Sequence, residues 1–231
     1  MMTRYIRFLA ALALVGFFSV SQNSFAQMGE VSIEGLVGIP QADFRNEVKR
    51  AGLGIGLTGG YQFPRTPVQV GAKFGFMNYG IDRRNAPLSN TIPDITVRVE
   101  NQYNIVQGHG YLRLTPPSGS FRPYVEGLAG FNYLFTQTAI YERGSNEQKI
   151  TDTNFDDTAL SYGLGGGFKV LLYADAGSNL YLDMRANYMF GNSATYLKKG
   201  SISVENGQAY YDAYRSATDL LLLHVGVSIT F

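Results

Sequence analysis

The sequence predicts an all-β protein, namely an eight-stranded antiparallel up-and-down transmembrane β-barrel preceded by a cleavable signal peptide. Three observations support this fold class. The first residues form an export signal, eight later segments alternate apolar and polar residues, and the connections between them are long and short in turn. No later segment approaches the run of about 18 apolar residues that marks a membrane helix, so a membrane crossing here requires strands.

The amino-terminal segment has the three parts of a secretory signal. Arg4 and Arg7 give it a positive start, and an apolar core of 13 residues follows at Phe8–Val20. This core is too short for a membrane anchor, which needs roughly 20 apolar residues. Small residues before the expected cleavage point divide the chain into a signal peptide, 1–26, and a mature barrel, 27–231.

Eight segments of the mature chain have the two-residue period of a β-strand, with apolar and polar side chains on opposite faces. Segments of about ten such residues, separated by turn residues, are typical of transmembrane barrels. In chain order the segments are Glu30–Ile39, Gly52–Phe63, Val68–Ile81, Tyr103–Leu114, Tyr124–Ile140, Leu160–Leu172, Leu180–Gly191 and Asp219–Phe231.

The connections between these segments alternate strictly in length. Three are short and contain Pro, Gly, Ser, Asp or Asn: Pro64–Pro67, Thr115–Pro123 and Tyr173–Asn179. An antiparallel barrel with both termini in the periplasm produces this alternation, because its periplasmic turns are short and its outer loops are long. The long outer loops are expected at about 40–51, 82–102, 141–159 and 192–218.

One face of every segment is apolar, and the only charge on these faces is Asp219, at the rim of the last segment. A Lys or Arg turned toward hydrocarbon would cost about 2–4 kcal/mol near the bilayer midplane, so we expect the uncharged faces to contact lipid. Aromatic side chains favour the two boundaries of a membrane. We expect Tyr61, Phe63, Tyr124, Tyr173 and Phe231 at the periplasmic boundary, and Tyr79, Tyr133, Phe135, Tyr162, Tyr188 and Phe190 at the outer one.

The opposite faces carry the ionic side chains. The interior of an eight-stranded barrel is just wide enough to be filled by side chains, and an unpaired buried charge is costly. We therefore expect a structural network of ion pairs in place of an ion-conducting lumen. Glycines on the same face, among them Gly60 and Gly167, are expected to leave room for long side chains. The network is expected to contain four acids and four bases: Glu30, Glu34, Lys73, Arg113, Glu126, Lys169, Asp183 and Arg185.

The composition argues against a nucleic-acid-binding protein and against a disulfide-stabilised one. Removing the two arginines of the signal from 19 basic residues leaves 17 against 18 acidic residues, a net charge of −1. This charge gives the mature chain no electrostatic affinity for nucleic acid. The chain has no cysteine, so an exported protein of this size must hold together without a disulfide framework.

No motif of enzymatic or metal chemistry is complete. The glycine-rich run Gly163–Gly167 lies within a strand pattern and no helix follows it, so it cannot cradle a phosphate. Asp152–Asp157 lacks the glycine and the glutamate of a calcium loop. His109 and His224, the only histidines, are expected to point inward from separate strands. We expect no catalytic residue, no metal and no cofactor.

The long loops are the expected region of interaction. Glu205–Gln208 has the Asn-Gly signal of a type I′ hairpin, and Ile95–Val99 and Gln148–Thr151 are expected to be strand extensions above the membrane. Exposed strand edges and tyrosine clusters are features of binding surfaces. Near Lys198 and Lys199, the residues expected to contact an extracellular protein or glycan are Tyr196, Tyr210, Tyr211 and Tyr214.

Three local patterns carry a family resemblance: Val-Gly-Ile-Pro at Val37–Pro40, Arg-Pro-Tyr-Val-Glu-Gly at Arg122–Gly127, and the aromatic terminus Phe231. With the signal, they make residues 27–231 similar to the small eight-stranded outer-membrane barrels, the OmpX- and OmpA-type porin-like domains of Bacteroidota-type bacteria. The resemblance implies insertion into the outer membrane of a Gram-negative bacterium by the barrel-assembly machinery. It also implies that this machinery recognises the last strand and Phe231.

The expected function is non-enzymatic: a porin-like protein of the cell outer membrane with a structural or surface-binding role. Its expected partners are the lipid bilayer, the assembly machinery and an extracellular protein or glycan, but no nucleic acid. Alternatives stay open on the sequence alone. A soluble exported lipocalin-like carrier would bury the same apolar faces around an apolar ligand. An outer-membrane lipid-modifying enzyme would use His224 with Ser228, and a narrow channel would pass small apolar solutes.

Overall fold

The computed structural model describes residues 29–89, 92–142, 148–175, 177–198, 200–205 and 208–231, and for those within 84–97, 140–154 and 202–211 it describes the backbone alone. The expected signal peptide and its cleavage point lie outside these residues. Within the described ranges, no helix is both long enough and apolar enough to span a bilayer.

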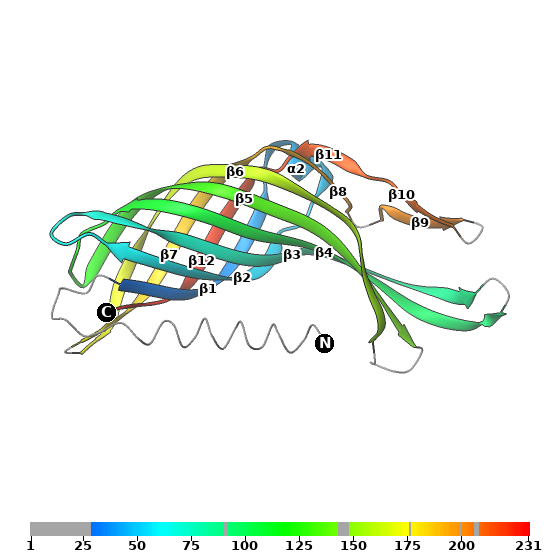
Figure 1. Cartoon of the computed structure of the whole chain (residues 1–231), viewed down its shortest axis with the longest axis horizontal. Helices are drawn as coiled ribbons and strands as arrows, with labels where there is room; N and C mark the ends of the chain where they lie inside the picture. Colours follow the sequence, from blue (N-terminus) through cyan, green and yellow to red (C-terminus); the bar gives the residue numbers. More distant parts are fainter. Residues whose placement is uncertain (1–28, 90–91, 143–147, 176, 199, 206–207) are drawn as a thin grey trace.

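Eight strands close into one antiparallel barrel, in the order β1, β12, β7, β6, β5, β4, β3 and β2 (Figure 1). Strands that follow one another in the chain are neighbours, and β12 closes the ring against β1. The fold class predicted from the sequence is therefore confirmed. The barrel strands are β1 (Gly29–Pro40), β2 (Gly52–Gln62), β3 (Val68–Ser89), β4 (Ile92–Leu114), β5 (Phe121–Glu142), β6 (Gln148–Ala174), β7 (Asn179–Gly191) and β12 (Leu220–Thr230).

The beginning of β1 and the carboxy-terminus meet at the end of the barrel that carries the short connections (Figure 1). The backbone amide of Gly29 donates to the carbonyl of Phe231 at 2.8 Å, and the amide of Phe231 donates back to Gly29 at 2.9 Å. We call this end the turn end, and the opposite end, which carries the long connections, the loop end.

Burial alternates along the barrel strands as the two-residue period predicts. Val125 is 60% exposed, whereas its neighbours Tyr124 and Glu126 are buried. The exposed set forms an apolar exterior around the barrel, which suits contact with hydrocarbon and would be unfavourable in water. Its members include Leu53, Ile55, Leu57, Phe74, Leu112, Phe131, Leu164, Met184, Leu223 and Val225.

Two of the predicted long loops are mostly strands. β3 continues to Ser89 and β6 begins at Gln148, so residues 82–102 and 141–159 belong largely to two long hairpins. Their composition resembles that of loops because they lie beyond the barrel, where neither face of a strand meets lipid. The strand extensions expected within these regions are confirmed.

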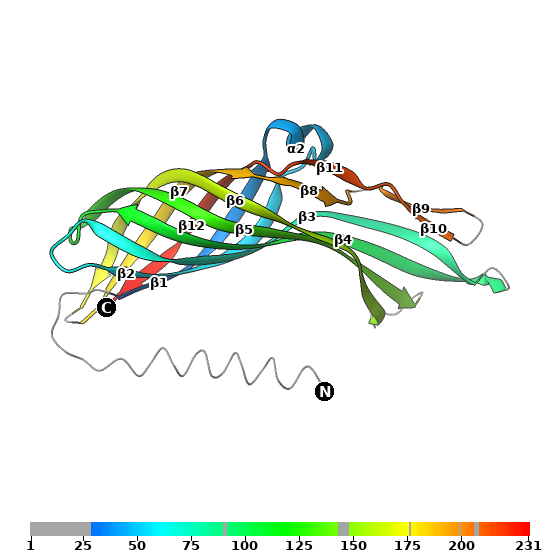
Figure 2. The same cartoon turned by 45° about the horizontal axis from the view of Figure 1, so that its top comes forward.

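The long parts of β3, β4, β5 and β6 form a sheet that rises beyond the rim at the loop end (Figure 2). β3 pairs with β2 only as far as Asn78, but with β4 as far as Ser89. β6 pairs with β7 only from Ser161 onward, but with β5 from Gln148. We call this sheet the outer extension; it comprises residues 79–89, 92–103, 136–142 and 148–160.

The other two long connections contain short elements at the loop end (Figure 2). The first includes a helix of six residues that lies beside β11 and the end of β1. The second folds into two small antiparallel sheets, β8 with β11 and β9 with β10. These elements are α2 (Ala42–Glu47), β8 (Ser193–Tyr196), β9 (Ile202–Glu205), β10 (Gln208–Tyr211) and β11 (Tyr214–Ala217).

The interior of the barrel changes character along its axis. The half near the turn end holds the ionic side chains, whereas the half near the loop end is an apolar core that the sequence pattern did not predict. Phe44 of α2, Tyr196 of β8 and the following Leu197 complete this core from above. The barrel strands contribute Leu36, Met77, Tyr79, Tyr103, Ile105, Tyr111, Leu128, Leu134, Met189, Leu220 and Leu222.

Two aromatic residues do not lie at the membrane boundary where we expected them. Tyr79 and Tyr124 are buried inside the barrel. The hydroxyl of Tyr79 donates to the carbonyl of Leu197 at 2.9 Å, and that of Tyr124 donates to the carboxylate of Asp183. Strand parity already places Tyr124 beside inward-facing Glu126, so the preference of tyrosine for membrane boundaries misled the prediction.

Candidate functional site

The lumen of the turn half is filled by an ion-pair network with Arg113 at its centre. The Arg113 side chain is fully buried. Its Nε donates to Oε2 of Glu126 at 2.8 Å, and its Nη1 donates to Oε1 of Glu30 at 3.2 Å. Its guanidinium carbon lies 4.0 Å from the ring centre of Tyr124 and 4.9 Å from that of Tyr111. Arg113 is thus held by two carboxylates and two aromatic faces.

The other ionic residues attach to the same network from the surrounding strands. Lys73 pairs with Glu126, and Lys169 pairs with Glu30. A second branch joins Arg185 to Glu34, and its Nη1 lies 3.6 Å from Oδ2 of Asp183. The structure brings the eight ionic residues predicted from the sequence together, and all of them are buried: Glu30, Glu34, Lys73, Arg113, Glu126, Lys169, Asp183 and Arg185.

The interior glycines make room for this network. A Cβ atom on Gly60 would clash with the hydroxyl of Tyr111, and one on Gly167 would meet Arg185 and the hydroxyl of Tyr124. These close approaches are of the kind that the sequence led us to expect for the inner face.

Several interior residues were missed by the sequence analysis. Gln69 donates to Oε2 of Glu30 at 2.9 Å, and Tyr111 packs against Arg113. Arg122 closes the turn end, because its Nε donates to the carbonyl of Pro116 at 2.8 Å and its guanidinium lies over Tyr181. Strand parity would have placed Gln69, Tyr111 and Arg122 inside, but their residue types are also common at barrel rims.

The tyrosine surface expected at the loop end is only partly correct. Tyr196 is buried, so it is not a surface residue. Its ring meets that of Phe44 edge-on with centres 5.0 Å apart, and its hydroxyl lies 2.9 Å from Oγ of Ser216. An aromatic side chain on a strand that crosses the barrel mouth packs inward, because the apolar core lies below it. The side chains of Tyr210 and Tyr211 lie outside the described residues.

Tyr214 remains at the surface and forms a polar cluster with Lys198. The Nζ of Lys198 lies 3.5 Å from the ring centre of Tyr214 and 2.7 Å from Oε2 of Glu47 on α2. Burial lowers the pKa of Lys198, but the hydrogen bond and charge of Glu47 raise it by more, so the net shift is upward. The hydrogen bond to Asp212 raises the pKa of Tyr214. This cluster links α2 to β11.

The outer extension has two strand edges without a barrel partner. Beyond Asn78 no described strand pairs with the β2-facing edge of β3, and before Ser161 none pairs in register with the β7-facing edge of β6. Near the rim, Oδ2 of Asp157 accepts a hydrogen bond from the backbone amide of Thr195 at 2.7 Å. Further from the rim, both edges present backbone amides and carbonyls that can pair with another strand.

The extension is also braced by a charged pair between an exposed arginine and a buried glutamate. Nε of Arg83 on β3 donates to Oε2 of Glu100 on β4 at 2.7 Å. This hydrogen bond is the main reason that the pKa of Glu100 lies below its ordinary value. The pair joins two strands that face each other in register, so it stabilises the β3–β4 hairpin above the barrel.

Among the described residues of the lumen, His224 and Ser228 are not hydrogen-bonded to each other. Nε2 of His224 and Oγ of Ser228 each lack a hydrogen-bond partner among the described residues, so they do not form a His–Ser pair. Nδ1 of His224 lies 3.3 Å from Oε1 of Glu34 instead. Within the described residues, no three side chains from His, Cys, Asp or Glu gather as metal ligands.

A closed antiparallel barrel with an apolar exterior and a filled ionic lumen defines an integral β-barrel membrane protein. The chain belongs to the outer membrane protein beta-barrel domain family, whose model matches residues 10–227. Its location is therefore the cell outer membrane, embedded in the bilayer, which excludes the soluble carrier considered from the sequence.

Three solved structures are similar in fold. Neisserial surface protein A is 11% identical with a TM-score of 0.41, and the match covers 88% of this chain and 97% of that one. Ail, the attachment invasion locus protein of Yersinia pestis, is 14% identical with a TM-score of 0.38, covering 88% and 97%. A major outer membrane protein from Thermus thermophilus is 12% identical with a TM-score of 0.35, covering 88% and 99%. No curated protein matches the sequence.

Proposed function

We propose that this barrel is a non-enzymatic surface-binding protein, and that its outer extension pairs with an extended segment of an extracellular protein. The observation that carries the proposal is the four-stranded outer extension with its two open edges on β3 and β6. Pairing of a strand with an open sheet edge supplies affinity through main-chain hydrogen bonds, and side chains along the edge supply selectivity. The barrel acts as a rigid membrane anchor for this sheet.

The filled lumen supports the binding role over a conducting one. Each base of the network has a carboxylate partner, and the apolar core with Phe44 closes the other half. An ion crossing this interior would have to separate buried ion pairs, which is strongly unfavourable. A protein with this interior acts through its exposed surface.

Shortening the β3–β4 hairpin tests the proposed binding edge. Asn85 faces Arg98 in the register, so removal of residues 85–98 leaves Arg84 opposite Val99, where a two-residue turn can join them. Intact cells that carry the wild-type or shortened protein are exposed to extracellular proteins, chemically crosslinked, and the barrel is purified with its partners. We expect the crosslinked protein to be lost in the shortened variant.

Removal of residues 202–211, which contain β9 and β10, is the matched control. It deletes a loop-end hairpin of similar kind but leaves both edges of the outer extension intact, so the partner should remain bound. Each variant must show the heat-dependent gel shift of a folded barrel. Loss of the partner in the control alone would assign binding to Tyr210 and Tyr211. A partner retained in all three proteins would exclude the β3 edge, and the absence of any crosslinked partner from the wild-type protein would favour a purely structural role.

We also propose that Phe231 is the residue that the barrel-assembly machinery recognises. Its ring is partly exposed on the apolar exterior, and its backbone is fixed to Gly29 at the seam between β1 and β12. Phe231→Ser should slow the appearance of folded barrel in pulse-labelled cells by several fold, whereas Phe231→Tyr keeps an aromatic ring and should assemble normally. Normal assembly of the serine variant would contradict this role.

A further inference from the structure

An open groove crosses the apolar exterior of the barrel on β4, β5 and β6. Its volume is about 470 Å³, which lies in the range of about 300–1,000 Å³ that is usual for small-molecule sites. None of the described residues that line the groove is charged. Most of its surface comes from Gly110, Leu112, Gly127, Ala129, Tyr162 and Leu164.

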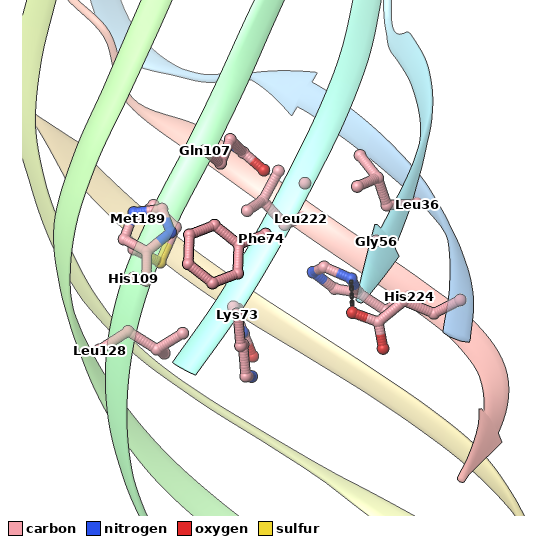
Figure 3. A pocket seen from close by; sticks show the side chains of 13 residues that line it. Leu36, Gly56, Lys73, Phe74, Gln107, His109, Leu128, Met189, Leu222 and His224 are labelled. Carbon is pink, nitrogen blue, oxygen red and sulfur yellow. Dashed lines mark ion pairs between the residues drawn. The ribbon is translucent and has the colours of Figure 1, made fainter. Parts of the chain in front are cut away.

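The floor of the groove consists of small residues that face outward. His109 and Leu128 point into the lumen, where they line the interior pocket drawn in Figure 3. Side chains alternate between the two faces of a strand. The chain neighbours of these two residues, namely Gly110, Gly127 and Ala129, therefore face the bilayer.

Two leucines form the sides of the groove. Leu112 on β4 and Leu164 on β6 both lie opposite Gly127 in the register. The side chain of Leu164 is 72% exposed, so it stands clear of the barrel wall. The Cα atoms of the two leucines are two strand spacings apart, roughly 10 Å. Carbon atoms pack at about 3.5–4.0 Å, so one hydrocarbon chain can contact both leucines and the glycine between them.

The groove rises obliquely toward the loop end. The strands of such a barrel are tilted, so a row of register neighbours climbs along the barrel axis. One such row, across β4, β5, β6 and β7, is Gly110, Ala129, Tyr162 and Phe190. The rings of Tyr162 and Phe190 border the upper end, with centres 5.7 Å apart. Because the long loops of an outer-membrane barrel face outward, this end lies in the outer leaflet.

Packing within the barrel does not require glycine on this floor. Beyond its chain neighbours, a Cβ atom on Gly110 would meet no atom closer than 3.8 Å, and one on Gly127 none closer than 3.6 Å. Gly108 differs, because a Cβ there would lie 2.8 Å from the ring of Phe131. A glycine weakens the interior of a strand. Gly110 and Gly127 therefore keep a space open at some cost in stability.

We propose that this groove is a binding site for one acyl chain of a lipid in the outer leaflet. The groove is continuous with the exterior that contacts hydrocarbon, so acyl chains are the molecules at its opening. A chain in the groove contacts the floor and both sides, whereas a chain elsewhere on the convex exterior contacts one surface. It therefore gains dispersion contacts, and it exchanges more slowly than the surrounding lipid.

A phospholipid with a photoreactive diazirine in one acyl chain tests for this site. The folded barrel in detergent micelles is mixed with an equimolar amount of this lipid and illuminated, and the labelled peptides are identified by mass spectrometry. We expect the label to concentrate on the outward residues of β4, β5 and β6, and to saturate at one lipid per barrel. Labelling spread evenly around the exterior would overturn the proposal.

Filling the groove should displace the lipid. Gly127→Leu and Ala129→Leu each add a branched side chain to the floor, and each should lower the labelling several fold. Gly59→Leu is the matched control, because a Cβ on this glycine of β2 has no atom within 4 Å, and this variant should label like the wild type. The heat-dependent gel shift identifies the folded barrels.

Unchanged labelling in folded Gly127→Leu and Ala129→Leu barrels would contradict the site. A second copy of the chain is the other molecule that could cover the groove in a membrane. Light scattering of the wild-type barrel in the same micelles detects it. A dimer that Gly127→Leu dissociates, in a barrel that takes up no lipid label, would assign the groove to that copy and overturn the proposal.

Discussion

Arg113 illustrates how a single side chain organises a lumen of this width. Its guanidinium contacts Glu30 and Glu126 and lies between the rings of Tyr111 and Tyr124. Glu30 is on β1, whereas Tyr124 and Glu126 are on β5, so the arginine couples its own strand β4 to β1 and β5. The dense ion pairing compensates the removal of these charges from water.

Breaking this network should be more costly than breaking a pair in which one partner stays in contact with water. Glu126→Gln leaves Arg113 and Lys73 without a shared carboxylate, and we expect a loss of about 3–5 kcal/mol in the free energy of unfolding. Glu100→Gln, the same substitution in the pair with Arg83, should cost less, about 1 kcal/mol, because the Arg83 side chain is 62% exposed and stays solvated when the charge of its partner is removed. Urea titration followed by circular dichroism measures both, since the chain has no tryptophan. Equal losses would contradict the structural role of the network.

Two adjacent glycines should respond oppositely to the same methyl group. A Cβ on Gly60 would clash with the hydroxyl of Tyr111 inside the lumen, whereas one on Gly59 has no atom within 4 Å. Gly60→Ala should therefore destabilise the barrel by about 1–3 kcal/mol through overpacking. Gly59→Ala should leave stability unchanged or slightly improved, and the same urea titration compares them. If the Gly60→Ala variant were as stable as the wild type, Tyr111 would be able to leave the network at little cost in free energy.

Strand parity determined which ionic residues could be predicted. Eight of them alternate with apolar neighbours on segments of clear period, so their inward direction followed from the sequence. Tyr111, Tyr124 and Arg122 have the same parity, but their residue types suit a membrane boundary or a rim equally well. The pairing of particular acids with particular bases depends on which strands adjoin and in what register, and this information is not local in the sequence.

At the scale of elements, the six-residue helix α2 matters through one side chain. Phe44 is fully buried and meets Tyr196 edge-on, while Tyr79 lies beside it with ring centres 6.2 Å apart. Glu47 of the same helix pairs with Lys198. A helix this short has little stability of its own, so these contacts hold it in place. The sequence marked this region only as a loop, because a buried aromatic among polar residues has no periodic pattern.

Phe44→Ala should weaken the packing of α2 against the apolar core. The loss of this buried aromatic ring should lower the free energy of unfolding by about 3–5 kcal/mol if α2 and the barrel unfold together. If α2 opens while the barrel stays folded, backbone hydrogen exchange in residues 42–47 should increase by at least tenfold. Asn46→Ala is the control, since Asn46 is exposed on the same helix and should leave exchange unchanged. Unaltered exchange in the Phe44 variant would show that Glu47 and Lys198 suffice to hold α2.

At the scale of the whole molecule, the surroundings of each face of the barrel wall determine which side chains it carries. Apolar residues line the exterior of the barrel because hydrocarbon surrounds it, and they line the loop half of the interior because α2 and β8 cover it. The first pattern was predictable, since period and the absence of charge are visible along the chain. The second was not, since an apolar residue on the inner face is recognised only when the segment that covers it is known.

The absence of cysteine allows this arrangement to be tested one position at a time. Val225 is 52% exposed on the exterior of β12, whereas Ser228 on the same strand is buried in the lumen. A spin label at Val225→Cys should be relaxed strongly by oxygen dissolved in the bilayer and weakly by a water-soluble nickel complex. A label at Ser228→Cys, introduced in the unfolded chain before insertion, should be shielded from oxygen in every barrel that folds. Strong relaxation of the Val225 label by the nickel complex would mean that this face meets water, and the lipid-facing assignment of the exterior would then be wrong.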